Sequence, residues 1–133
     1  MKIAFITDDG KTISQHFGRA GHYLVVTLED SKEAAREMRE KLGHAHFADG
    51  HEHGHEHHGA GHGHDSHSHQ KHLRMAETIA DCETLVCRGM GQGAYQSMQA
   101  QGIRPVVTDI VAIDEALAAY LAGGLQDHPE KLH

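Results

Sequence analysis

Histidine is the residue type through which this chain could do most of its chemistry. The sequence has 16 histidines in 133 residues, and 12 of them lie between positions 44 and 72. Most recur as His-x-His, a spacing that places two imidazoles on the same side of an extended chain. The candidate metal ligands are His44, His46, His51, His53, His55, His57, His58, His62, His64, His67 and His69.

Neutral imidazole suits zinc, nickel, cobalt and copper ions. At roughly four ligands per tetrahedral ion, these histidines could hold about three ions. An expression tag is the simpler interpretation, but tags are usually terminal and uniform. This run is internal and is mixed with Gly, Glu and Asp. We therefore predict that it binds divalent transition metals.

Residues 44–69 have no apolar periodicity and almost nothing to bury. Such a segment cannot offset the entropy of ordering its own backbone, so we expect a disordered loop in the absence of metal. The rest of the chain is long enough for one compact domain over residues 1–125, interrupted by this loop and followed by a polar tail, residues 126–133, that we expect to be loose.

The formal net charge is −7 with the histidines neutral, and residues 44–72 contribute −3 of it. Nucleic acids and anionic membrane surfaces are therefore poor partners. The first apolar run is too short for a signal sequence and no stretch approaches a membrane span, so we expect a cytoplasmic protein. Cys82 and Cys87 are too few for a disulfide scaffold, and we interpret them as reduced, partly buried thiols.

The elements that must position any site can be read from the apolar pattern. Residues 3–6 form a short apolar run before Asp-Asp-Gly, which predicts a buried strand and a turn, and residues 11–21 indicate an ordered loop. Residues 22–28, 84–87 and 104–108 are also predicted strands. Helices are predicted around residues 73–80, 91–101 and 112–121.

The second half therefore alternates helix and strand, which is typical of parallel βαβ units. The first two strands have no helix between them and should pair antiparallel. Residues 31–42, SKEAAREMREKL, are ambiguous. Their composition favours a helix, and an amphipathic edge strand is the alternative.

Two stretches resemble the dinitrogenase iron–molybdenum cofactor biosynthesis family. ISQHFGRA lies in the first half, and GMGQGAYQSMQAQGI in the second. Together they are fairly specific, and the resemblance covers nearly all of the chain except the histidine insert and the tail. It implies an α/β, ribonuclease-H-like fold with a five-stranded mixed sheet and three helices. It also implies a third strand at residues 31–42, so the histidine loop would follow that strand.

The resemblance further implies that the protein binds or carries an anionic metal–sulfur cluster, such as the iron–molybdenum cofactor or its precursors, as an accessory of nitrogen fixation. The partners would be the proteins that donate or accept the cluster. The histidine of the QHFG motif, here His16, would contact the cluster. Imidazole on a glycine-flanked loop at a strand end can reach an exposed metal. A hydrogen bond that caps the loop is the alternative role.

Other candidate contacts lie close to His16 in the expected fold. Arg19 could bind a carboxylate on the cluster's organic ligand, or could form a surface salt bridge. The glycine-rich turn offers main-chain N–H groups at a helix start, which favour an anion; its residues are Gly89, Met90, Gly91, Gln92 and Gly93. Cys87 and Met90 could be soft ligands, although burial of both side chains is the simpler expectation. Both loops should lie at one edge of the sheet.

Two further functions compete with a cluster carrier. The protein could be a transition-metal buffer or chaperone that works through its histidine loop. It could also be a hydrolase, because Asp8, Asp9 and Asp109 follow strands, where ribonuclease-H-like nucleases keep metal-binding carboxylates. Asp-Asp-Gly is first a turn signature, no nucleophile–base pair is evident, and the charge is wrong for a nucleic-acid substrate. We therefore expect a carrier and no enzyme.

Overall fold

The computed structural model describes residues 1–41 and 74–132. They form a five-stranded mixed sheet in the order β3-β2-β1-β4-β5. The strands are β1 (Lys2–Thr7), β2 (His22–Glu29), β3 (Lys32–Glu40), β4 (Thr84–Cys87) and β5 (Arg104–Val107). β1 pairs antiparallel with β2, and β2 with β3, whereas β1, β4 and β5 run parallel to one another. The expected α/β, ribonuclease-H-like fold is confirmed.

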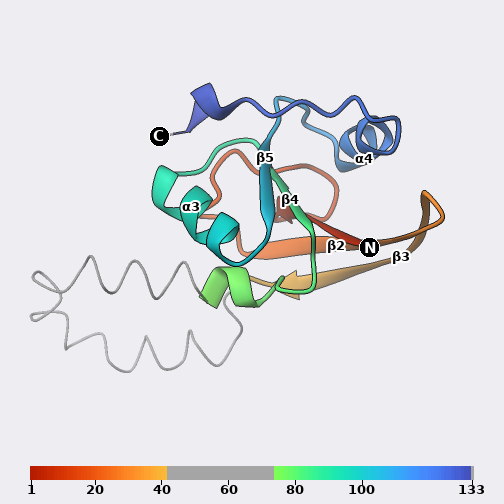
Figure 1. The fold of residues 1–133 in the computed structure, drawn as a ribbon, viewed down its shortest axis with the longest axis horizontal. Helices are drawn as coiled ribbons and strands as arrows, with labels where there is room; N and C mark the ends of the chain where they lie inside the picture. Colours follow the sequence, from red (N-terminus) through yellow and green to blue (C-terminus); the bar gives the residue numbers. More distant parts are fainter. Residues whose placement is uncertain (42–73, 133) are drawn as a thin grey trace, which may run out of the picture.

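Helices cover both faces of the sheet (Figure 1). Residues 74–77 are helical and lie on the same face as α3 (Gln92–Ala100), while α4 (Ile113–Leu121) lies on the other. Side chains alternate along β2, so Tyr23 and Val26 face opposite sides. The Tyr23 hydroxyl donates to the Met75 carbonyl at 3.0 Å, and Arg36, the partner of Val26, reaches Asp114 of α4. None of the helices within the described ranges is long and apolar enough to cross a membrane.

Residues 32–40 form a strand although their composition favours a helix. The reason lies in the turn before them, where Asp30 and Ser31 have φ angles of 52° and 63°. Two consecutive residues with positive φ make the tight turn that joins antiparallel strands. This turn pairs Glu29 with Lys32 and commits the following residues to the sheet. Almost every β3 side chain is exposed, and its charges suit an edge strand.

The polar tail is not loose in its described part, contrary to the expectation from sequence. The Asp127 carboxylate accepts a hydrogen bond from the Val107 N–H at 2.8 Å, and the His128 N–H donates to the Val107 carbonyl at 2.8 Å. These bonds cover the outer edge of β5. A short 3₁₀ helix, η2 (Pro129–Lys131), follows. The histidine loop, whose mobility the sequence predicts, lies outside the described residues.

Candidate functional site

The candidate site lies where the chain leaves β1 and β4. These strands are parallel neighbours, so their carboxyl ends meet at one edge of the sheet. The chain turns from β1 toward β2 on one side, and from β4 toward α3 and β5 on the other. Such a topological switch point is the place where open α/β sheets bind ligands. We call it the switch-point edge.

Two main-chain hydrogen bonds join the loops at the switch-point edge. The N–H of Phe17 donates to the carbonyl of Gly89 at 3.1 Å, and the N–H of Arg88 donates to the carbonyl of Ser14 at 3.3 Å. The loop after β1 and the glycine-rich turn after β4 therefore form one continuous surface, as the sequence predicts.

Two carboxylates shape the loop after β1. Asp9 accepts hydrogen bonds from the N–H groups of Lys11 and Thr12, at 2.9 and 2.8 Å, and these donors hold the pKa of its carboxyl well below the usual range. Asp8 accepts from the N–H of Gly21 at 2.9 Å, which closes the far end of the loop. Both side chains thus hold the loop that carries His16.

His16 lies at the exposed turn of this loop. Its carbonyl accepts hydrogen bonds from the N–H groups of Arg19 and Ala20, both at 3.0 Å. Its imidazole bonds to no residue in the described parts of the chain, so it does not cap the loop in the way that the simpler interpretation required. A side-chain carbon added at Gly18 would meet nothing within 4 Å, which shows that the turn is open.

Arg19 is exposed on the same turn and forms no ion pair with the residues described here. The salt-bridge alternative is therefore not seen. Its guanidinium remains available to an anion that approaches the loop.

The glycine-rich turn leads directly into α3. Gly91 is the N-cap residue, no side chain caps the helix, and the first turn contains no acidic residue. The first hydrogen bond of the helix runs from the Tyr95 N–H to the Gly91 carbonyl, at 3.1 Å. The N–H groups of Gln92 and Gly93 therefore have no partner within the helix, and both residues are exposed. This end of α3 is partly positive and uncapped.

The two sulfur atoms near this turn are not available at the surface. Met90 is 1% exposed and Cys87 is fully buried. Burial raises the pKa of the Cys87 thiol to about 12, so the thiolate that would bind a metal is strongly disfavoured. Both side chains belong to the core. Cys82 is likewise buried and free.

Three residues at the switch-point edge were not singled out from the sequence. Arg88 lies between β4 and the glycine-rich turn, and its Nε is buried without a hydrogen-bond partner among the described residues. The Gln15 side-chain oxygen, with the amide oriented toward Arg88, accepts from Nη2 and Nη1 at 3.0 and 3.3 Å. Lys41 is buried beneath the loop and donates to the Phe17 carbonyl. Of the three, only Gln15 could have been found from the sequence, because it is the first residue of the QHFG motif and directly precedes His16.

Within residues 1–41 and 74–132, the carboxylates are not gathered into a hydrolytic centre. Asp8 and Asp9 serve the loop, and Asp109 is exposed beyond β5. In residues 1–41 and 74–132, no group of three or more His, Cys, Asp and Glu side chains is placed to hold a metal ion. The eleven histidines from His44 to His69 lie outside the described residues.

Solved structures share this fold at low sequence identity. The crystal structure of PH0822 is 18% identical, with a TM-score of 0.66 and 96% of both chains covered. A candidate dinitrogenase from Methanocaldococcus jannaschii is 14% identical, with a TM-score of 0.64, 96% of this chain and 94% of that one covered. The apo form of the orange protein from Desulfovibrio gigas is 20% identical, with a TM-score of 0.63 and coverages of 96% and 92%. No curated protein matches the sequence.

The family comparison is more specific than these likenesses of fold. The family model described as dinitrogenase iron-molybdenum cofactor matches residues 1–123, which include the loop of His16, the glycine-rich turn and all five strands. This chain therefore belongs to the dinitrogenase iron–molybdenum cofactor family.

Proposed function

We propose that this protein is a carrier for an anionic metal–sulfur cluster of the iron–molybdenum-cofactor type, bound at the switch-point edge. The observation that carries the proposal is the pair of main-chain hydrogen bonds between the loop after β1 and the glycine-rich turn. Through them, the imidazole of His16, which has no partner in the described parts of the chain, and the uncapped N-terminus of α3 belong to one exposed surface.

The donor groups on this surface suit such a cluster. The His16 imidazole has no competing hydrogen bond within the described chain and is a suitable ligand for a transition metal. Arg19 can bind a carboxylate on an organic ligand of the cluster through two parallel hydrogen bonds. The N–H groups of Gln92 and Gly93 can donate hydrogen bonds to further negatively charged atoms of the cluster. The Met90 thioether takes no part, because the side chain is buried.

A carrier role also agrees with how the carboxylates are used. A nuclease of this fold would need Asp8 or Asp9 free to bind a metal, and both accept hydrogen bonds from the main chain of the loop. The two free, buried thiols suit a reducing compartment, and we expect the carrier to work in the cytoplasm with the proteins that donate and accept the cluster.

The direct test is anaerobic loading with isolated iron–molybdenum cofactor, followed by elemental analysis and titration. His16→Ala should weaken binding by at least about tenfold, the loss typical of a removed or disoriented metal contact. His128→Ala is the matched control, because His128 contacts Glu130 in the tail, far along the chain from the loop. Equal affinity of both variants and the parent protein would refute the carrier site.

We further propose that the histidine segment recruits zinc, nickel, cobalt or copper ions, since eleven imidazoles lie there, ten of them at His-x-His spacing. Replacing residues 44–69 by a glycine–serine linker should remove binding of these ions in calorimetry and leave cluster binding intact. If the replacement abolished cluster binding as well, the buffer or chaperone function would be favoured, with the segment as its functional site.

A further inference from the structure

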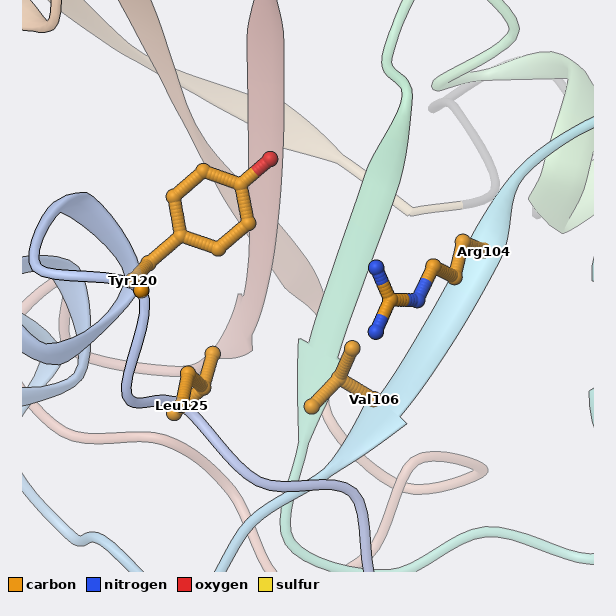
Figure 2. A pocket seen from close by; sticks show the side chains of 5 residues that line it. Arg104, Val106, Tyr120 and Leu125 are labelled. Carbon is orange, nitrogen blue, oxygen red and sulfur yellow. The ribbon is translucent and has the colours of Figure 1, made fainter.

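A second concave feature lies away from the switch-point edge. A cavity of about 340 Å³ is lined by Arg104, Val106, Tyr120, Gly123 and Leu125 (Figure 2). Arg104 begins β5, at the amino end of the parallel strands, whereas the loop of His16 lies at their carboxyl end. The cavity is therefore separate from the proposed cluster site.

One wall of the cavity is apolar and comes from three different elements. Val106 projects from the middle of β5, Tyr120 presents its ring from the last turn of α4, and Leu125 comes from the segment that follows α4 (Figure 2). Gly123, with φ of 78°, reverses the chain between Tyr120 and Leu125, so that both side chains border one space.

The single charge in the cavity is the guanidinium of Arg104, which reaches from β5 toward the Tyr120 ring (Figure 2). Arg104 has no ion pair and its side chain has no hydrogen bond with the described residues. Among the described residues, the Tyr120 hydroxyl has a single weak contact, at 4.0 Å, with the sulfur of Met1. By contrast, Arg36 and Arg39 on β3 each bind carboxylates.

The Arg104 guanidinium and the apolar wall beside it determine which ligand would fit. The guanidinium fork binds a carboxylate through two hydrogen bonds, and the Tyr120 hydroxyl could donate a third. The remainder of the ligand would pack on Val106, Tyr120 and Leu125. The volume is near the lower end of the range for small-molecule sites, about 300–1,000 Å³, so the ligand must be small.

We propose that this cavity is a second binding site, for a small organic carboxylate with an apolar ring or chain, in which Arg104 binds the carboxylate. The ligand needs both its carboxylate and its apolar part, because the carboxylate would bind Arg104 and the apolar part would pack on the apolar wall. The site is independent of the cluster, and the test needs no metal.

The test is a titration of the ¹⁵N-labelled full chain followed by NMR. The probes are benzoate, benzamide, which has the ring without the charge, and acetate, which has the charge without the ring. Benzoate should shift the amide signals of residues 104–107 and 120–125 and saturate in the millimolar range or below. Benzamide and acetate should shift them at least about tenfold less effectively, since each lacks one half of the recognition.

Arg104→Gln should weaken benzoate binding at these signals by about tenfold or more, which is the effect of losing a charge-assisted hydrogen-bonded pair. Arg104→Lys keeps the positive charge but not the forked pair of donors, so its affinity for benzoate should lie between those of the parent protein and Arg104→Gln. Arg74→Gln, at an exposed arginine in the helical segment 74–77, is the matched control and should leave binding unchanged.

Three results would overturn the proposal: no shift at residues 104–107 and 120–125, equal effects of benzoate and benzamide, or benzoate binding that persists in Arg104→Gln. Shifts confined to residues 15–20 and lost in Arg19→Gln would also overturn it, and would leave the cluster site standing. Thermal melts of the variants check that each is folded.

Discussion

The side-chain ammonium of Lys41 donates a hydrogen bond to the main-chain carbonyl of Phe17 and also lies over the Phe17 ring, with Nζ 4.8 Å from the ring centroid. Lys41 is only 3% exposed, and its own N–H donates to the Gly21 carbonyl at 2.9 Å. It directly follows β3 and precedes the residues that carry the histidine repeats. One residue thus ties the end of β3 to the loop that presents His16.

Lys41→Met should destabilise the protein, because the methionine fills much of the same space but leaves the buried Phe17 carbonyl without this donor. We expect a loss of about 1–3 kcal/mol in the free energy of unfolding, measured by urea denaturation. Amide exchange of residues 16–21 should become faster. Lys11→Met, at an exposed lysine of the same loop, should change neither quantity, and equal stability of the two variants would contradict the role of Lys41.

The ion pair between Arg39 and Asp81 predicts a pH dependence of stability. Arg39 donates to both oxygens of Asp81, at 2.7 and 2.9 Å, and Lys2 adds a bond at 3.0 Å. These donors, of which Arg39 has the largest effect, hold the pKa of the Asp81 carboxyl well below its usual range. A lowered folded pKa gives stability that is present above the unfolded value, near 4, and is lost as pH falls toward the folded value.

Asp81→Asn should therefore cost about 1 kcal/mol at pH 7, a modest value because the Asp81 side chain is 45% exposed and solvent screens the pair. The difference from the parent protein should shrink as the pH is lowered below about 4, measured by urea denaturation across the range. Asp109→Asn, which removes an exposed carboxylate after β5, should show no such trend. A difference that stays constant with pH would contradict the assignment.

The strands with a clear apolar pattern could be predicted from sequence alone. Residues 84–87 form β4 as predicted: Thr84 is β-branched, the three residues after it are apolar, and all four side chains are buried, as in a strand covered on both faces. β3 could not be derived from its composition, since the turn at Asp30 and Ser31 decides its conformation and Ser31 stands at the position where such a turn usually has glycine. The strand was predicted only from the resemblance to the cofactor family.

The candidate site was predictable only in part. That the two loops would meet followed from parallel strands sharing one edge of the sheet. The roles of Arg88 and Lys41 did not, because each depends on which distant main-chain or side-chain group it meets in the folded chain. The order of the tail could not be predicted for the same reason: Asp127 binds the edge of β5, and the sequence does not indicate which strand edge lies beside the tail.

The two cysteines should be unreactive in the folded protein. Burial raises the pKa of both Cys82 and Cys87 to about 12. The thiolate fraction at pH 8 then falls by about a thousandfold relative to an ordinary thiol, and alkylation slows accordingly. Mass spectrometry after iodoacetamide treatment should find both thiols unmodified under native conditions and both modified in urea. Rapid native alkylation of Cys87 would show that its sulfur is accessible and would return it to the candidate ligands.

The tail at Asp127 and His128 takes the place of a further strand beside β5. Val107 is fully buried, its N–H donates to the Asp127 carboxylate, and its carbonyl accepts from the His128 N–H. Asp127→Ala should leave the Val107 N–H without a partner and cost about 1–3 kcal/mol of unfolding free energy. Asp127→Asn keeps an acceptor oxygen and should cost less, and Gln126→Ala, at an exposed neighbour, should be neutral.

Hydrogen exchange of the Val107 amide provides the local measurement: it should accelerate in Asp127→Ala and stay slow in Asp127→Asn. Equally slow exchange in both variants would mean that the main-chain bond from His128 alone holds this edge, and that the carboxylate does not protect it.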